Sequence, residues 1–231
     1  MTAKANRIER YYDSHEMEGE ELGQSGLHFA LIKYLVELLE WFFRGQAVGI
    51  VSDINFYQTD QPNEPPKCPD IAVVNGLELE LLSDSEDEIS SYYVGEDGSP
   101  PRLAIEIASR STWQADLVEK PGLYAAMGIN EYLVVDPHLS TVWRGEWYDK
   151  RRLVGWRLDL LKGEYVELVK DAAGRLWSEQ LDSWLVVEGK ILRLYTADGQ
   201  MRLTESEAER ARAARLAEIL LRDGYKSEEV L

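Results

Sequence analysis

The clearest alternation of apolar and polar positions lies between Pro101 and Pro137. From Leu103 to Ala108 the sequence reads LAIEIA, in which three large aliphatic residues alternate with Ala, Glu and Ala. A period of two predicts a short strand, and this strand carries one charged residue, Glu106. Because an ionised carboxylate in a dry core is costly, such a group is usually exposed, paired, protonated or bound to a metal.

A helix is expected directly after this strand. Ser111 or Thr112 can cap its start, and Gln114 follows Ser111 in the spacing of a capping box. Pro121 lacks a backbone N–H and disfavours helical angles in the residue before it, so we expect a kink or a restart there. Gly128 fits the helix end, and the apolar run YLVV that follows predicts a second buried strand. The order strand, helix, strand is typical of a parallel pair in an α/β sheet.

Weaker patterns precede this unit. The periodicity of apolar residues over Leu27 to Phe43 predicts a helix with His28 on its buried face. His28 is then either a core histidine with its hydrogen bonds made or a group that touches the site. Val48 to Phe56 predicts a strand with a bend at Asp53. A proline-rich approach then leads into another strand whose first residue is Asp70, which is either a turn cap or a carboxylate delivered to a strand edge.

The second half of the chain predicts short strands and a terminal helix. A hairpin is expected around Arg144 and Gly145, followed by strands within 152–160, 165–169 and 186–195. The helical pattern over 206–222 is charged and amphipathic, and it either packs on the domain or pairs with a second copy.

The patterns together predict an α/β fold. A mixed sheet has the His28 helix on one side and the Lys120 helix bridging the central strands, while additional antiparallel strands extend or flank the sheet. We divide the chain into a main domain over 17–200 and the charged C-terminal helix over 201–231.

Composition narrows the class of protein. A chain of 231 residues with 45% hydrophobic content can bury a full core, and no apolar run is long enough to span a membrane. The N-terminus lacks the apolar region of a signal peptide and Cys68 is the only cysteine, so we expect a cytoplasmic protein without an internal disulfide or a cysteine-rich zinc site.

Charge argues against nucleic-acid binding by the surface as a whole. The formal net charge is −17, and such an average field repels phosphates. A dense acidic run from Glu78 to Asp97 is interpreted as a solvated insertion remote from the site.

Several enzyme motifs are absent, and a set of three residues remains. The chain contains no phosphate-binding G-x-x-x-x-G-K, no dinucleotide G-x-G-x-x-G, no H-E-x-x-H and no G-x-S-x-G. Asp70 at a strand start and Glu106 within a strand are suited to Mg²⁺, which prefers oxygen ligands and retains several waters. Lys120 on the following helix can orient or deprotonate a metal-bound water, or neutralise charge on a phosphate.

The ordered set resembles the Uma-two family of restriction-endonuclease-like proteins, a domain-of-unknown-function family in the PD-(D/E)XK nuclease superfamily. The resemblance rests on Pro69-Asp70, Glu106 in IEIASRST, Asp116, Lys120, Tyr124 and the segment GINEYLVVDP. It spans roughly residues 17–147, and the block from 101 to 137 is its specific part.

The resemblance implies roles for single residues. Asp70 and Glu106 match the two metal-binding carboxylates, and the backbone carbonyl of Ile107 is implied as a further metal ligand. The usual lysine two positions after the acid is Ala108 here. The family therefore implies that Lys120 takes its place, with Tyr124 contacting substrate or supporting the lysine, and with Arg110 as the alternative cation.

The implied function is metal-dependent cleavage of DNA phosphodiester bonds by a metal-activated water, with Mg²⁺ as the ion and Mn²⁺ as its substitute. A homodimer is expected because cleavage of both strands often uses two sites related by a twofold axis. The alternative is a catalytically inactive nuclease fold that binds a partner, which the net charge and Ala108 favour. A third reading is a hydrolase for another phosphate-containing substrate.

Overall fold

The computed structural model describes residues 26–58, 65–77, 91–109, 112–138 and 152–222. A six-stranded mixed sheet forms its centre, in the order β1-β3-β5-β6-β7-β8. Its strands are β1 (Val48–Val51), β3 (Ile71–Asn75), β5 (Leu103–Ile107), β6 (Glu131–Val135), β7 (Leu153–Asp159) and β8 (Glu164–Glu167). β5 and β6 are parallel, and the other neighbouring pairs in this sheet are antiparallel. The predicted α/β fold and the predicted parallel pair are confirmed.

Two smaller sheets accompany the central one. β9 (Leu176–Ser178), β10 (Ser183–Glu188) and β11 (Ile191–Tyr195) form an antiparallel sheet, and β2 (Asn55–Gln58) pairs in parallel with β4 (Ser91–Val94). The strands expected after Trp143 therefore both extend the central sheet, as β7 and β8, and flank it. The expected hairpin around Arg144 and Gly145 lies outside the described residues.

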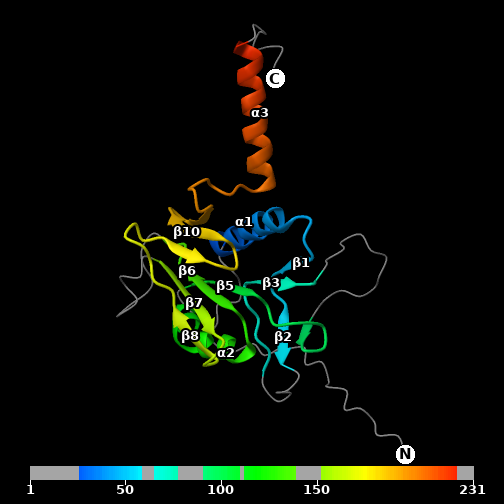
Figure 1. Cartoon of the computed structure of the whole chain (residues 1–231), viewed down its shortest axis with the longest axis vertical. Coiled ribbons are helices and arrows are strands. Elements are labelled where there is room, and N and C mark those ends of the chain that lie inside the picture. Colours follow the sequence, from blue (N-terminus) through cyan, green and yellow to red (C-terminus); the bar gives the residue numbers. More distant parts are fainter. Residues whose placement is uncertain (1–25, 59–64, 78–90, 110–111, 139–151, 223–231) are drawn as a thin grey trace, which may run out of the picture.

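Helices cover both faces of the central sheet (Figure 1). α1 (Gly26–Phe43) packs on one face, against the side chains of Leu103, Ile105 and Ile107. α2 (Lys120–Met127) packs on the other face, against Ala104 and its neighbours. Because β5 is buried on both faces, Glu106 points toward the α2 layer and lies under protein rather than in water.

The third helix, α3 (Glu205–Arg222), projects away from the sheets in Figure 1. Thr204 and Glu207 form a capping box, in which each side chain accepts the other residue's backbone N–H. Oε1 of Glu207 also forms an ion pair with Nη1 of Arg193 at 2.7 Å, and this contact links the first turn of α3 to β11. No residue of α3 is buried. None of the helices in the described ranges combines the length and apolar character that a membrane span needs.

Two predictions about the N-terminal half were wrong in detail. The segment from Val48 to Phe56 is not one bent strand. Asp53 has a φ of 58°, a left-handed conformation that few residues other than Gly, Asn and Asp adopt, and the chain turns there from β1 into β2 of another sheet. The acidic run from Glu78 to Asp97 is not solvated throughout, because its described part contains β4, where Tyr92 is buried in the α2-side core.

A buried ion pair ties the three-stranded sheet to the central one. Glu131 at the start of β6 is fully buried, and Arg157 donates to its Oε1 from Nε at 2.9 Å and from Nη2 at 2.8 Å. Ser178 of β9 donates its hydroxyl to Oε2 at 2.5 Å, and the Glu179 N–H donates to Oε1 at 2.9 Å. Because each carboxylate oxygen is hydrogen-bonded, this buried charge stabilises the junction of the two sheets.

Candidate metal and phosphodiester site

The candidate site lies where β3 begins, β5 ends and the following helix starts. β3 begins one residue later than predicted, so Asp70 directly precedes it, and the first residue of β3, Ile71, pairs with Ile105 of β5. This register sets Asp70 and Glu106 on adjacent strands. The Oδ2 atom of Asp70 accepts the N–H of Ile107 at 2.7 Å, so the carboxylate continues the hydrogen bonding between β3 and β5 at the point just before β3 begins.

His28 of α1 contacts the same carboxylate. Its Nε2 lies 3.1 Å from Oδ1 of Asp70, and both side chains are largely buried, at 12% and 18% exposure. Of the two interpretations of His28 from sequence, the structure supports the one in which it touches the site. The two oxygens of Asp70 are thus held by groups from different elements, which fixes the orientation of the carboxylate.

Glu106 is held from the α2 side. Tyr124 donates its hydroxyl to Oε1 at 2.5 Å, and Nζ of Lys120 lies 2.9 Å from the same oxygen. Burial raises the pKa of Glu106 to about 8; Lys120 and the Tyr124 hydrogen bond oppose that rise, whereas Asp70 and Asp116 add to it. The group therefore lacks enough positive charge nearby to be ionised at its ordinary pKa.

Lys120 lies between two carboxylates. Its Nζ is 2.9 Å from Glu106 and 2.7 Å from Oδ1 of Asp116. Burial alone lowers the pKa of the ammonium group, but Glu106 and Asp116 outweigh burial, so that the pKa is raised. Lys120 is therefore a fixed cation, which suits charge neutralisation or hydrogen-bond donation better than proton abstraction.

A π-helical turn, η1 (Ala115–Glu119), places Asp116 and Lys120. The Lys120 N–H donates to the carbonyl of Ala115, five residues back, and α2 begins at Lys120. In a regular α-helix, the ring of Pro121 would collide with the carbonyl of Leu117. That carbonyl would also lack a hydrogen bond, because Pro121 has no backbone N–H to donate to it. The wider π turn avoids both problems. The restart expected near Pro121 is confirmed.

At the start of this helical segment, the capping bonds that the structure describes join Ser109 and Thr112. The cap is Ser109, whose hydroxyl accepts the Thr112 N–H at 3.1 Å, while Oγ1 of Thr112 accepts the Ser109 N–H at 3.1 Å. Gln114 makes no capping hydrogen bond. The sequence S-x-x-T forms a capping box in which the Thr112 hydroxyl replaces the usual Glu or Gln side chain. The sequence pattern for a capping box, which requires Glu or Gln, therefore does not detect it. Ser111 and Arg110, the alternative cation, lie outside the described residues.

Asp116 is the site residue that sequence reasoning left without a role. Its side chain is 1% exposed, and burial raises its pKa. Oδ1 is ion-paired with Lys120, while Oδ2 accepts no hydrogen bond in the described part of the chain. The spacing of four between Asp116 and Lys120 indicated a shared helical face, but nothing in the sequence showed that Asp116 is buried.

The carboxylates of the candidate site are oxygen donors, the ligand type that hard divalent cations prefer. Glu106 and Asp116 share the ammonium group of Lys120, whereas Asp70 contacts His28. Within the described ranges, no group of three or more His, Cys, Asp and Glu side chains is arranged to hold a metal ion. Two carboxylates with a backbone oxygen suit Mg²⁺, which binds few protein ligands and keeps its waters.

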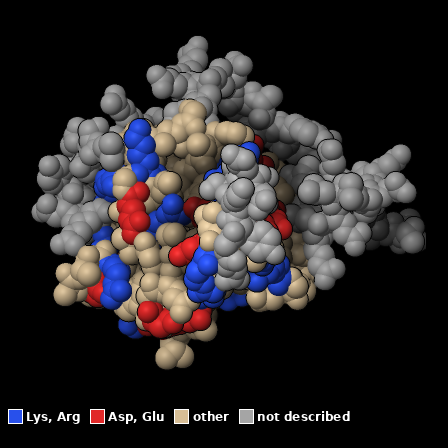
Figure 2. All heavy atoms as spheres, turned by 90° about the horizontal axis from the view of Figure 1, so that it is seen from above, with Lys and Arg blue, Asp and Glu red and all other residues tan. Residues whose placement is uncertain are grey.

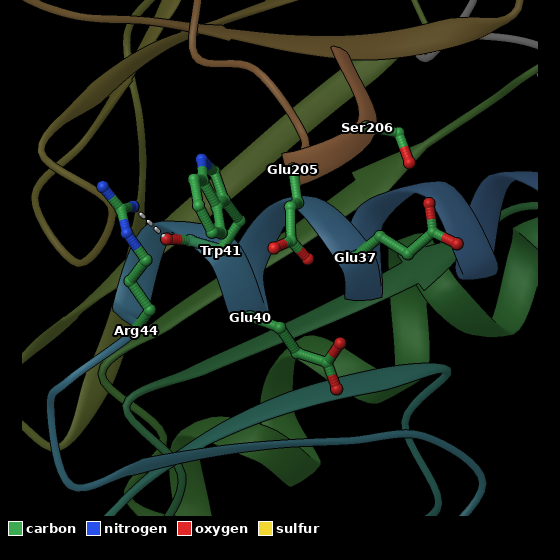
Figure 3. A pocket seen from close by; sticks show the side chains of 6 residues that line it. All are labelled: Glu37, Glu40, Trp41, Arg44, Glu205 and Ser206. Carbon is green, nitrogen blue, oxygen red and sulfur yellow. Dashed lines mark hydrogen bonds between the residues drawn. The ribbon is translucent and has the colours of Figure 1, made fainter. Parts of the chain in front are cut away.

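A separate hollow of about 380 Å³ lies between α1 and the start of α3 (Figure 3). Glu37, Glu40, Trp41, Arg44, Glu205 and Ser206 line it. Arg44 stacks on the Trp41 ring, with its guanidinium carbon 4.0 Å from the ring centroid. Because none of the candidate site residues lines this hollow, its residues supply controls for experiments on the site.

Comparison with known proteins gives the chain its family. A search of curated proteins found no match. A solved structure, described as a putative nuclease belonging to DUF820 from Anabaena variabilis ATCC 29413, is 16% identical with a TM-score of 0.43, and the match covers 68% of this chain and 80% of that one. The model of the Uma2 family, described as "Putative restriction endonuclease", matches residues 9–188. This match spans most of the chain, which therefore belongs to the Uma2 (Uma-two) family, as the residues from 101 to 137 indicated.

Proposed function

We propose that this protein is a metal-dependent endonuclease that hydrolyses DNA phosphodiester bonds. The observation that carries the proposal is the group formed by buried Glu106 and partly buried Asp70 and Lys120, at the start of β3, in β5 and at the start of α2, in a member of a nuclease-type family. Its excess of carboxylates over cations favours a divalent ion, with Mg²⁺ as the physiological choice and Mn²⁺ as a substitute.

Asp70 and Glu106 would hold the ion, together with the backbone carbonyl of Ile107. When bound, Mg²⁺ supplies a Lewis acid and a water of lowered pKa. Tyr124 and His28 fix the two carboxylates, so the ligands need little reorganisation. Lys120 remains protonated and donates hydrogen bonds to the negative charge that grows on the phosphoryl oxygens.

The acidic surface limits how DNA is bound. On the face that carries α3, acidic and basic side chains are interspersed, and no broad basic field is visible (Figure 2). With a net charge of −17, nonspecific attraction to phosphates is weak. The proposal therefore assigns much of the contact with the scissile phosphate to Lys120 and the bound ion. We also propose that the protein forms a homodimer with two sites. Measuring its mass in solution by light scattering tests this proposal.

The test is cleavage of mixed single- and double-stranded DNA with Mg²⁺, with Mn²⁺ or with EDTA, alongside calorimetric titration of each metal. We expect metal-dependent cleavage that Asp70→Asn, Glu106→Gln and Lys120→Met each reduce by at least about 100-fold. Metal binding should be lost when Asp70→Asn and Glu106→Gln are combined. Glu40→Gln, in the hollow beside α1, is the control and should cleave like the wild type. Cleavage that survives all three substitutions would contradict the assignment.

The second candidate is a catalytically inactive nuclease fold that binds a partner. The observation in its favour is that Lys120 already pairs with both Glu106 and Asp116 without a metal, in a chain that also carries a strong negative charge. Absence of metal binding by the wild-type protein would support this candidate. Cleavage of a phosphorylated small molecule but not of DNA would instead support a hydrolase for another phosphate-containing substrate.

A further inference from the structure

Lys120 has two carboxylate partners, and only one of them belongs to the proposed metal site. Glu106, 2.9 Å from Nζ, would turn its oxygens toward the ion. A ligand that shares its charge with a metal holds a neighbouring ammonium group less firmly. The second partner, Asp116 at 2.7 Å, then becomes the group that keeps Lys120 at the site.

The local structure holds Asp116 in place for this task. Its main-chain carbonyl accepts the hydroxyl of Tyr132 at 2.7 Å, and Tyr132 is itself buried between Tyr124 and Trp156. The η1 turn and Pro121 then set the positions of Asp116 and Lys120 relative to each other.

The burial of Asp116 needs a physical reason. A carboxylate that is 1% exposed, with one oxygen lacking a hydrogen bond in the described part of the chain, is costly to fold. A hydrophobic residue of similar size would cost less at a purely structural position. The partners of its side chain in the described structure are Thr112, at the start of the helical segment, and Lys120, whose Nζ lies 2.7 Å from Oδ1.

We propose that Asp116 is a positioning residue, which acts through Lys120 and holds its ammonium group against the scissile phosphate while Glu106 binds the ion. This inference rests on the proposed nuclease function. It predicts that the contribution of Asp116 to catalysis disappears when Lys120 is absent.

A double-mutant cycle of Asp116→Asn and Lys120→Met tests this dependence, with kcat measured at saturating Mg²⁺. On the wild-type background, Asp116→Asn should lower kcat by about 10- to 100-fold and leave KM nearly unchanged. On the Lys120→Met background, it should change kcat by less than about twofold. A purely structural residue would lower kcat by the same factor on both backgrounds, and that result would overturn the inference.

The same four proteins also report on the contact without catalysis. Urea unfolding should show that the two substitutions are coupled. The free energy of unfolding should fall less in the double variant than the sum of the decreases in the two single variants. Lys33→Met and Glu37→Gln provide the matched control, because this exposed pair on α1 has the same spacing of four and Nζ and Oε1 are 3.9 Å apart. It should show almost no coupling and normal cleavage.

The outcomes separate the two proposals. Absence of metal-dependent cleavage by the wild type would overturn the proposed function and the positioning role with it. If the wild type cleaves normally but the two decreases in kcat multiply in the double variant, the positioning role alone would be overturned. The same would follow if urea unfolding showed no coupling.

Discussion

Cys68 lies beside the candidate site without belonging to it. Although the residue is exposed, its thiol donates to Oδ1 of Asp53 at 3.6 Å. Desolvation by its neighbours and the negative charges of Asp53, Glu106 and Asp70 raise the pKa of the thiol to about 12. The thiolate is the reactive form, so this cysteine should react slowly despite its exposure.

The single thiol therefore reports on metal binding. We expect Mg²⁺ to accelerate the reaction of Cys68 with iodoacetamide severalfold at mildly alkaline pH, because a cation held by Asp70 and Glu106 lowers the pKa of the thiol. Intact-protein mass spectrometry gives the rate directly, since the chain has no other cysteine. The combined Asp70→Asn and Glu106→Gln variant should react faster without metal and should not respond to Mg²⁺. A response that persists in that variant would assign the metal to another place.

The segment from η1 into α2 contains two residues whose substitution tests helix stability and site geometry separately. Pro121 and Gly122 are adjacent and both are poor helix formers, but only Pro121 requires the π turn. Gly122 is exposed, and a Cβ added there meets nothing within 4 Å.

Alanine at these two positions should have different effects. Gly122→Ala should stabilise the protein by about 0.5–1 kcal/mol and leave cleavage unchanged. Pro121→Ala restores an N–H that can bond to the Leu117 carbonyl, so the π turn can relax and carry Lys120 away from Glu106. We therefore expect cleavage to fall at least about tenfold without loss of stability. Urea unfolding and kcat distinguish the cases, and equal activity in both variants would show that the π turn is not needed.

This segment also shows what the sequence could and could not predict. The strand of Glu106, the helix stop at Gly128 and the second strand follow from local rules, because period, cap and breaker residues all agree. The π turn places Lys120 against Glu106 of β5 as well as Asp116 of η1, and no local sequence pattern contains the contact with β5. The burial of Asp116 likewise depends on Tyr132, which is sixteen residues away in sequence. The role of His28 was left open because its distance from Asp70 is a tertiary property.

Across the protein, charge buried in the core is paired in two different ways. Glu131 accepts hydrogen bonds from Arg157 and from three further donors. Glu106 shares one ammonium group with Asp116 and has a raised pKa. The first arrangement is complete in the protein alone and joins two sheets. The second leaves two carboxylates on one ammonium group, and under the proposed function a bound metal ion supplies the further positive charge.

This difference makes the stability of the metal-free protein depend on pH. The pKa of Glu106 is about 8 in the folded chain and 4.5 ordinarily. Between these values the folded chain keeps a proton that the unfolded chain has lost. The free energy of unfolding should therefore be highest below the lower value and fall, by on the order of a few kcal/mol, as pH rises toward the upper one.

Urea unfolding in EDTA across this pH range measures the effect. Glu106→Gln, which cannot ionise, should flatten the dependence, and it should be more stable than the wild type at the alkaline end because it removes an underpaired buried charge. Mg²⁺ should stabilise the wild type most at the alkaline end, where Glu106 is already deprotonated, and should stabilise Glu106→Gln little. If wild type and variant showed the same dependence on pH with and without Mg²⁺, Glu106 would be neither the buried acid that sets this dependence nor a ligand of the metal.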